Sequence, residues 1–129
     1  MELAFGSEYD AFREEVRTFI KDNWPPADGD VKSPENTRTF VLAATERGYM
    51  HRSIPRIYGG GEQPSDIAKA EIIREELSKA RAPSARIPGN GLVVGTLLEW
   101  GTEEQKQRFI PDTLSGKIVW AQGFSEPNA

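Results

Sequence analysis

The chain has 129 residues, with 16 basic and 20 acidic side chains and a formal net charge of -4. The basic residues are interleaved with acidic ones, which speaks against nucleic acid as a partner because a phosphate-binding surface needs clustered positive charge. The absence of cysteine excludes disulfides, thiolate chemistry and cysteine-ligated metals, and a single histidine cannot form a metal site alone.

The amino terminus, "MELAFGSEYD", lacks the basic start and the apolar stretch of a signal peptide. No apolar run in the sequence approaches the roughly 20 residues that a membrane-spanning helix needs. We therefore expect a cytoplasmic protein without a membrane span. At this length the chain fits one domain with a modest core.

The first predicted helix covers about residues 8–22. Its apolar residues recur at steps of three and four, the period of a half-buried helix. They are Tyr9, Phe12, Val16, Phe19 and Ile20. We expect Ser7 and Asp10 to form a capping pair at its start. The Pro25-Pro26 pair ends it, because proline cannot continue the hydrogen bonding of a helix.

The second predicted helix starts at Ser33 and Pro34, which supply a side-chain cap and a first-turn proline. It ends at Gly48, where a left-handed backbone is expected. The following stretch, "MHRSIPRIYGGG", has no helical period. Its proline and its three consecutive glycines predict a loop with unusual backbone angles.

The third predicted helix begins at Pro64-Ser65-Asp66 and ends before Pro83. A helical period divides its residues into two faces. The buried face is predicted to consist of Ile67, Ala70, Ile73, Leu77 and Ala80. The solvent face is predicted to consist of Glu71, Arg74, Glu75 and Lys79.

The fourth predicted helix lies in "PGNGLVVGTLLEWG", from Pro88 to Gly101. Because it is apolar on nearly every side, we expect it to be buried between its neighbours. Gly91 and Gly95, four residues apart, would let another backbone approach closely. The "GNGLVVG" run also looks like a glycine-rich phosphate loop, but no strand precedes it, which favours helix packing over dinucleotide binding.

The last predicted elements are a short charged helix and a strand. Thr102 and Gln105 form a capping box for "TEEQKQRF", and residues 111–116 are expected to form a turn or a one-turn helix. "KIVWAQGF" is rich in β-branched and aromatic residues, which predicts a strand, and a strand needs partners for its backbone. The predicted fold is mainly α, a bundle of about five helices, with a C-terminal strand that would begin a β domain missing from this chain.

The titratable residues do not suggest a catalytic centre. Glu75-Glu76 and Glu103-Glu104 are neighbours in the sequence and point to different faces of a helix. This favours a solvated face and an acidic first helical turn over paired catalytic carboxylates. We interpret His51 as a structural or exposed histidine, because no partner for nucleophilic catalysis is visible.

Two segments resemble the same family. Ile54-Pro55, Tyr58 and Gly59-Gly60 resemble the "IP..YGG" loop between the second and third helices of acyl-CoA dehydrogenases, and "SEPNA" at 125–129 looks like the start of that family's "[TS]EP.AGSD" signature. "TEEQKQRFIPDTLSGKIVWAQGFSEP" is similar to the stretch that joins the family's two first domains. The resemblance covers essentially the whole chain. It identifies residues 1–116 as the helical amino-terminal domain and 117–129 as the start of a truncated β middle domain.

The resemblance implies the chemistry of the complete protein. Members of this family bind FAD and oxidise acyl-CoA thioesters, such as those of fatty acid metabolism, to the trans-2-enoyl form. An electron-transferring flavoprotein or a similar acceptor reoxidises them, and they form tetramers. Their catalytic base is a glutamate in a carboxy-terminal domain that this sequence lacks. We therefore expect no catalytic residue here and no dehydrogenase activity from this chain alone.

The resemblance also implies two groups of binding residues. The contacts to the pyrimidine side of the flavin map onto Gln122, Phe124 and Ser125. The candidates for the acyl-chain pocket are Ile87, Asn90, Leu92 and Val93. Gln122 departs from the aromatic residue that is frequent at its position in the family, so its side chain has no assigned role.

Two alternatives stay open at this stage. One is a related flavoprotein oxidase, such as an acyl-CoA oxidase or a nitroalkane oxidase, because the features that separate these enzymes lie outside this chain. The other is a free-standing helical interaction module without catalysis. The sequence does not give the length or type of the acyl group.

Overall fold

The computed structural model describes residues 5–85 and 90–121. Within them the chain forms five α-helices and one short 3-10 helix. They are α1 (Ser7–Asn23), α2 (Pro34–Glu46), η1 (Arg56–Tyr58), α3 (Ile67–Lys79), α4 (Asn90–Trp100) and α5 (Glu103–Leu114). The prediction of a mainly α fold with about five helices is confirmed.

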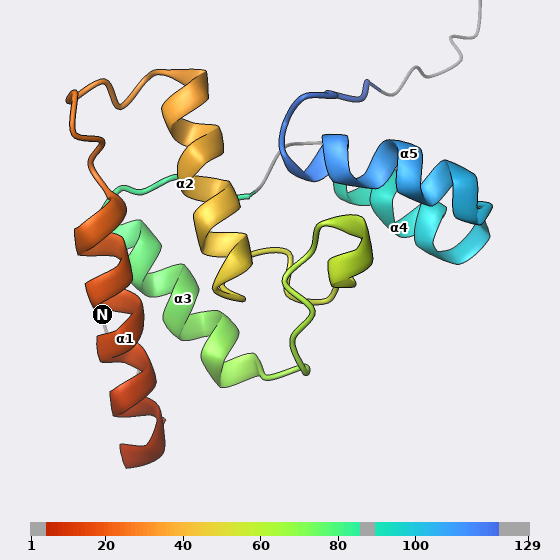
Figure 1. Cartoon of the computed structure of the whole chain (residues 1–129). Helices are drawn as coiled ribbons and strands as arrows, with labels where there is room; N and C mark the ends of the chain where they lie inside the picture. The colour runs from red at the N-terminus through yellow and green to blue at the C-terminus, as the bar shows by residue number, and fades with distance from the viewer. Residues whose placement is uncertain (1–4, 86–89, 122–129) are drawn as a thin grey trace, which may run out of the picture.

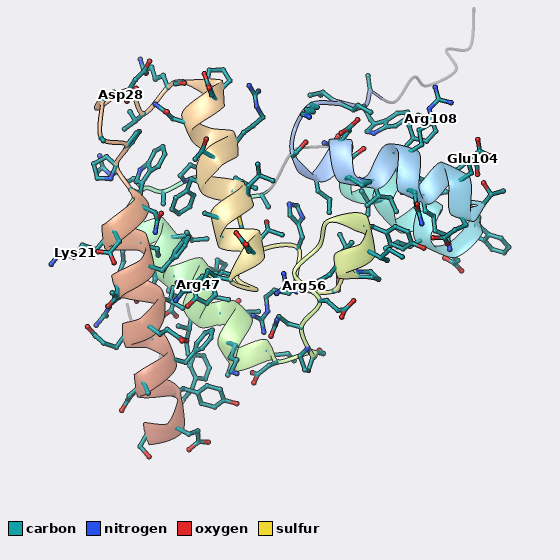
Figure 2. All side chains as sticks on the ribbon, viewed as in Figure 1. Lys21, Asp28, Arg47, Arg56, Glu104 and Arg108 are labelled. Atoms are coloured by element: carbon teal, nitrogen blue, oxygen red, sulfur yellow. The ribbon has the colours of Figure 1, made fainter. Side chains whose placement is uncertain are left out.

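The helices form two groups, which we call the three-helix unit (α1, α2 and α3) and the two-helix unit (α4 and α5). In Figure 1 the three-helix unit lies on one side, α4 and α5 lie side by side on the other, and the yellow-green loop that contains η1 runs between them. Exposed charged side chains occur on both units. Lys21 on α1 and Glu104 on α5 are exposed examples (Figure 2).

The start of α1 differs from the predicted cap. The residue before the helix is Gly6, with a φ of 102°, and no side chain caps the first turn. The capping pair of Ser7 and Asp10 is therefore wrong, because Ser7 is already helical and its backbone cannot adopt the extended angles of a cap. The predicted end is confirmed, since the helix stops at Asn23, two residues before Pro25.

Both predicted signals of α2 are confirmed. The hydroxyl of Ser33 accepts a hydrogen bond from the backbone N–H of Asn36, and Pro34 is the first helical residue. Gly48 follows the helix with a φ of 83°, the left-handed backbone that only glycine adopts at low cost.

The faces of α3 differ from the prediction. Ile67 is 81% exposed, and Ala70 and Ala80 are also exposed, so these three do not line the core. The buried residues are Ile72, Ile73, Glu75, Glu76 and Leu77. The helix is rotated so that two carboxylates face α1, because arginines of α1 pair with them there.

Helix α5 is longer than predicted. Thr102 and Gln105 form the predicted capping box, with both reciprocal hydrogen bonds present. The helix then continues through Pro111 to Leu114, so the separate turn predicted for 111–116 is wrong. A proline inside a helix removes one backbone donor but does not always end the helix, and the burial of Ile110, Thr113 and Leu114 keeps this one intact.

The predicted strand is absent from the part of "KIVWAQGF" that the structure describes. Residues 117–121 are irregular, and 122–124 lie outside the described residues. A β-rich composition creates a strand only when a neighbouring strand pairs with it, and residues 5–85 and 90–121 contain no strand. Local propensity therefore predicted a structure that these residues cannot complete.

Each unit has its own core. The core of the three-helix unit is rich in aromatic rings, and Phe19 contacts both Phe40 and Tyr49 at centroid distances of 5.7 and 5.3 Å. The core of the two-helix unit is smaller. It consists of Ile54, Tyr58, Val94, Ile110 and Leu114. Ile54 and Tyr58 come from the loop between α2 and α3, so this loop belongs to the core of the second unit.

The glycines of the "YGGG" run let this loop fold on itself. A Cβ on Gly60 would collide with the carbonyl group of Ile54, and one on Gly61 would lie 2.6 Å from the carbonyl oxygen of Met50. The Gly61 N–H donates to the His51 carbonyl at 2.8 Å, which closes the loop. The Tyr58 hydroxyl then donates to Glu103 at 2.7 Å and ties the loop to α5. The motif is therefore used here to join the two units.

Candidate functional site

The described part of the predicted site is the first turn of α4. Asn90, Leu92 and Val93 lie in that first turn. Ile87, Gln122, Phe124 and Ser125 lie outside the described residues. Only the first group can therefore be placed, and the roles of all seven stay predictions.

Asn90 connects three segments of the chain. It is buried, and its amide Nδ2 faces two backbone carbonyls, that of Thr113 at 3.4 Å and that of Ile118 at 3.5 Å. Its Oδ1 accepts a hydrogen bond of 3.2 Å from the backbone N–H of Trp120. A backbone N–H is always a donor and a carbonyl always an acceptor, so these partners fix which amide atom is oxygen and which is nitrogen.

A second set of contacts holds the same segment from the side of α5. The indole Nε1 of Trp120 donates to the hydroxyl of Thr113 at 2.9 Å, and its ring meets Phe109 edge-on at 5.8 Å. The Thr113 hydroxyl donates in turn to the Phe109 carbonyl at 2.6 Å. The chain leaving α5 is therefore held by both α4 and α5 up to Trp120.

The prediction that α4 is buried between its neighbours is wrong for the described residues. Only Asn90 and Val94 of this helix are buried. Leu92 is 61% exposed and Trp100 is 79% exposed, while Val93 is half-buried. The helix packs on α5 along one side and leaves its other apolar side uncovered within this part of the chain.

The glycines of α4 do not carry out their predicted role in this part of the chain. A Cβ added to Gly91 or Gly95 would meet no described atom within 4 Å. No backbone among residues 5–85 and 90–121 therefore approaches them. The first turn of α4 therefore carries the exposed apolar side chain of Leu92 and the buried, hydrogen-bonded amide of Asn90.

The buried acidic residues of α3 were missed by sequence reasoning. Glu75 and Glu76 were predicted to lie on a solvated face, but both are buried, and Arg13 of α1 contacts them at 3.0 and 2.6 Å. Arg17 contacts Glu76 at 2.6 Å. The signal was present on α1, because Arg13 and Arg17 lie one turn apart on the same side as its buried Val16 and Ile20.

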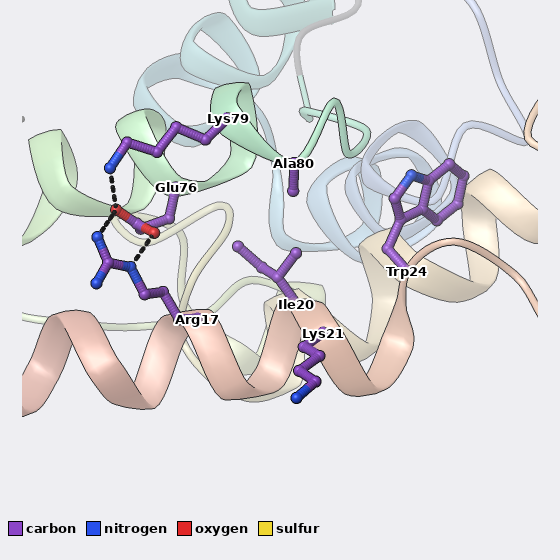
Figure 3. Close-up of a pocket in the computed structure, with 7 residues that line it drawn as sticks. All are labelled: Arg17, Ile20, Lys21, Trp24, Glu76, Lys79 and Ala80. Atoms are coloured by element: carbon purple, nitrogen blue, oxygen red, sulfur yellow. Dashed lines mark hydrogen bonds and ion pairs between the residues drawn. The ribbon is translucent and has the colours of Figure 1, made fainter. Parts of the chain in front are cut away.

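This ion network borders a shallow hollow of about 270 Å³ between α1 and α3. Figure 3 shows Glu76 bridged to Arg17 and Lys79, with Ile20, Trp24 and Ala80 beside them. Burial acts to raise the pKa of Glu76, but the hydrogen bonds from Arg17 and Arg13 outweigh it, so the pKa lies below its ordinary value of 4.5. Glu76 is therefore ionised near neutral pH and joins two helices.

Histidine 51 lies where the loop between α2 and α3 meets the end of α5. It is half-buried, and its Nε2 atom is buried without a hydrogen-bond partner among the described residues. Burial lowers the pKa of His51, against a hydrogen bond with the backbone of Leu114 that acts to raise it. The structural interpretation of this residue fits its position better than an exposed one.

Glu103 and Glu104 occupy the first turn of α5, as predicted. The described residues contain no group of three or more His, Asp or Glu side chains arranged to hold a metal ion. None of the described helices combines the length and the apolar character required to cross a membrane.

Known proteins resemble this chain along almost its whole length. The family described as "Acyl-CoA dehydrogenase, N-terminal domain" matches residues 6–117. The chain is 38% identical over 96 residues to acyl-CoA dehydrogenase FadE34 of Mycobacterium tuberculosis. That match covers 74% of this chain and 13% of the relative. It is 31% identical over 128 residues to the mitochondrial long-chain specific acyl-CoA dehydrogenase of Sus scrofa, covering 97% of this chain and 29% of the relative.

A third relative, acyl-CoA dehydrogenase IpdE1 of Mycolicibacterium smegmatis, is 32% identical over 133 aligned positions. That match covers 95% of this chain and 33% of the relative. The chain thus spans about a third or less of the length of these relatives. The matched region ends at residue 117, just after α5, where the segment held by Asn90 and Thr113 begins. The chain belongs to the acyl-CoA dehydrogenase family and corresponds to its N-terminal domain.

Proposed function

We propose that this chain is the helical N-terminal part of an FAD-dependent acyl-CoA dehydrogenase that oxidises an acyl-CoA thioester to the trans-2-enoyl-CoA. The observation that carries the proposal is the family match over residues 6–117, followed in the sequence by "WAQGFSEPNA". Relatives that match nearly the whole chain are named acyl-CoA dehydrogenases and extend over about three times its length.

The proposed cofactor contacts are Gln122, Phe124 and Ser125. Backbone amides and a serine hydroxyl suit a flavin, because its ring edge offers carbonyl and ring-nitrogen acceptors. The described chain reaches Ala121, and Trp120 is held there by Asn90 and Thr113. When bound, FAD would supply the hydride acceptor. The residues of this chain would hold and orient the ring edge.

The proposed acyl-chain contacts are Ile87, Asn90, Leu92 and Val93. Support comes from Leu92, which is a large apolar side chain left exposed by α5 and the loop. An apolar surface of this kind suits an alkyl chain, because burial of each CH₂ group is favourable by about 0.8 kcal/mol. The catalytic base of the proposed reaction lies outside this chain, so the chain alone would be inactive.

The remaining parts of the proposal concern the whole protein. An electron-transferring flavoprotein or a similar acceptor would reoxidise it, and it would assemble as a tetramer. Residues 117–129 would open its β middle domain. The predicted cytoplasmic location remains a prediction, and the pig relative is described as mitochondrial.

The proposed function is tested on the whole protein that contains this chain. Flavin binding is measured by spectroscopic titration of the apoprotein, and turnover is measured with a series of acyl-CoA thioesters and an artificial electron acceptor. A flavoprotein that reduces this acceptor with an acyl-CoA supports the proposal. A folded protein that binds neither FAD nor acyl-CoA would contradict it and would favour the non-catalytic module, and a requirement for oxygen as acceptor would favour an oxidase.

Replacing Ser125 tests the placement of the cofactor contacts. Ser125→Pro removes a backbone donor and restricts the preceding residue. Loss of one hydrogen bond to a buried acceptor costs about 1 to 3 kcal/mol, so the FAD dissociation constant should rise roughly tenfold or more. Ser125→Ala keeps the amide and should show a smaller rise. Unchanged FAD affinity in a folded Ser125→Pro protein would show that the contacts are wrongly placed.

A further inference from the structure

In a β-sheet the backbone groups of a segment like the one after α5 would bond to a neighbouring strand. Here the side chain of Asn90 bonds to two of these groups. The carbonyl of Ile118 and the N–H of Trp120 are two residues apart, and both meet the same side-chain amide. In a parallel sheet a residue on the neighbouring strand makes this same pair of contacts, donating to one residue and accepting from the residue two further on. The Asn90 amide therefore makes the pair of contacts that one residue of a neighbouring parallel strand would make.

The geometry points to Asn90 as a positioning residue that sets the register of residues 117–121 and, through them, the place of the residues predicted to contact the flavin. This inference rests on the proposed function, which assigns flavin contacts to Gln122 and to residues shortly after it. Gln122 is the second residue after Trp120. Even in a paired strand, a shift of one residue turns every side chain to the opposite face, so a displacement of this segment would move the side chains that follow it. A contact that fixes the backbone of Trp120 therefore also limits where the following residues can lie.

Two further features make Asn90 suited to this task. It is buried, so water competes little for its amide, and it begins α4, which packs along α5. Its Nδ2 also faces the carbonyl of Thr113, whose hydroxyl binds the Trp120 indole. Asn90 and Thr113 therefore hold Trp120 at its backbone and at its side chain. Leu, Ala or Asp at position 90 could not supply both a donor and an acceptor near neutral pH.

The first test is hydrogen exchange of the whole apoprotein, read by mass spectrometry on peptides that cover residues 117–121. In Asn90→Ala the exchange of this segment should become roughly fivefold faster or more, which corresponds to one lost hydrogen bond. Peptides from α3 serve as an internal reference and should keep their exchange rate. Equal exchange of residues 117–121 in the wild type and in Asn90→Ala would overturn the inference.

Two variants separate a positioning role from a general loss of structure. Asn23→Ala removes an amide that donates to the Phe19 carbonyl at 2.8 Å in an exposed position, and it should leave residues 117–121 unchanged. Asn90→Asp replaces the donor with a carboxylate oxygen that faces two carbonyls. Its segment should exchange rapidly near neutral pH and recover wild-type protection when the carboxyl is protonated and donates again. The absence of recovery at low pH would count against the inference.

The second test is FAD affinity of the same whole-protein variants. Asn90→Ala should raise the FAD dissociation constant roughly fivefold or more, whereas Asn23→Ala should not. Unaltered FAD affinity together with faster exchange at 117–121 would overturn the positioning role while leaving the proposed function intact. A wild-type protein that does not bind FAD would overturn both, and this outcome is recognised without any variant.

Discussion

The three-helix unit and the two-helix unit bury their residues in opposite ways. Helix α1 carries charged residues along most of its length, yet it buries Val16, Phe19, Ile20 and even Arg13. Helix α4 has a single charged residue, Glu99, and buries only Asn90 and Val94. Burial in this protein therefore follows the partners available to a helix and not its apolar content. The most apolar helix keeps an uncovered side within the described chain.

Arg13 shows how a charged side chain can be buried. Its guanidinium faces Glu75 and Glu76 on α3, and burying a charge is tolerated when it is paired and hydrogen-bonded. On the same helix Phe12 and Phe19 meet the ring of Tyr49 edge-on. The three-helix unit thus combines an aromatic core with a satisfied ion network. The two-helix unit has a smaller core, whose described residues are aliphatic, such as Ile110, apart from the aromatic Tyr58.

The largest expected effect comes from removing an aromatic ring from the core of the three-helix unit. Phe19 is 5% exposed and contacts Phe40, Tyr49 and the Arg47 guanidinium. Phe19→Ala should lower the free energy of unfolding by about 3 to 5 kcal/mol, because it loses burial and leaves a cavity. Urea denaturation measures this change.

Leu42→Ala on α2 is the control for that measurement. Leu42 is an apolar residue of the same unit, but it is 53% exposed. The substitution should therefore change the free energy of unfolding by less than about 0.5 kcal/mol. If both variants lost similar stability, the contrast between a buried aromatic core and its surface would be wrong.

The second prediction concerns the ion network of the three-helix unit. Glu76→Gln keeps the size of the side chain and removes the charge that pairs with Arg13 and Arg17. The free energy of unfolding should fall by about 1.5 to 3 kcal/mol, since hydrogen bonds to charged groups contribute that much. The stabilisation by Glu76 should also be lost in acid, as the pH falls through its lowered pKa.

Glu71→Gln is the matched control, because Glu71 lies on the same helix and also pairs with an arginine, Arg74, at 2.8 Å. That pair is exposed, so solvent screens it and its loss should have almost no effect. Both variants are compared by thermal and urea unfolding at neutral pH. A large loss in Glu71→Gln, or none in Glu76→Gln, would show that burial does not decide the strength of these pairs.

Sequence reasoning succeeded where local chemistry decides the structure. Ser33 with Pro34, Gly48, and Thr102 with Gln105 mark helix ends through contacts within a few residues, and the structure contains all three. Reasoning failed where distant partners decide. Glu75 was placed on the solvent side because nothing near it in the sequence reveals Arg13, which lies 62 residues away.

The same limit applies to the candidate site. The sequence identified Asn90 through family resemblance, but it could not show that its amide binds Thr113, Ile118 and Trp120. A strand was predicted from the composition of 117–124, although a strand exists only with a neighbour. The contact that replaces this neighbour comes from a side chain at the start of another helix. No local pattern encodes such a contact.

The third prediction compares the core of the two-helix unit with the uncovered side of α4. Ile110 is fully buried, so Ile110→Val should cost about 0.5 to 1.5 kcal/mol in the free energy of unfolding. Leu92→Ser is a more drastic substitution than Ile110→Val, but it is made at an exposed position, so it should cost less than about 0.5 kcal/mol. The unfolding of this chain, free of other segments, is the measurement. A larger loss in Leu92→Ser would show that the first turn of α4 is covered after all.

The smallest expected effect concerns the protonation of His51, which lies where the loop between α2 and α3 meets the end of α5. His51 is the single histidine of the chain. Burial lowers its pKa below the ordinary value of 6.5, although the hydrogen bond with the Leu114 backbone opposes this. Arg52 and Asp66 line the same hollow beside it. The folded protein therefore binds a proton at His51 less readily than the unfolded chain does.

Stability from a neutral His51 should be fully present above pH 6.5 and should decrease as the pH falls from 6.5 toward the lower pKa of the folded state. Glu76 has a pKa below 4.5 and loses its contribution only in stronger acid, so the two effects are separated on the pH axis. His51→Gln cannot take up a proton and should flatten the pH dependence of the urea midpoint between about pH 7 and 5. If His51→Gln kept the slope of the wild type in that range, protonation of His51 would not be what weakens the folded state there.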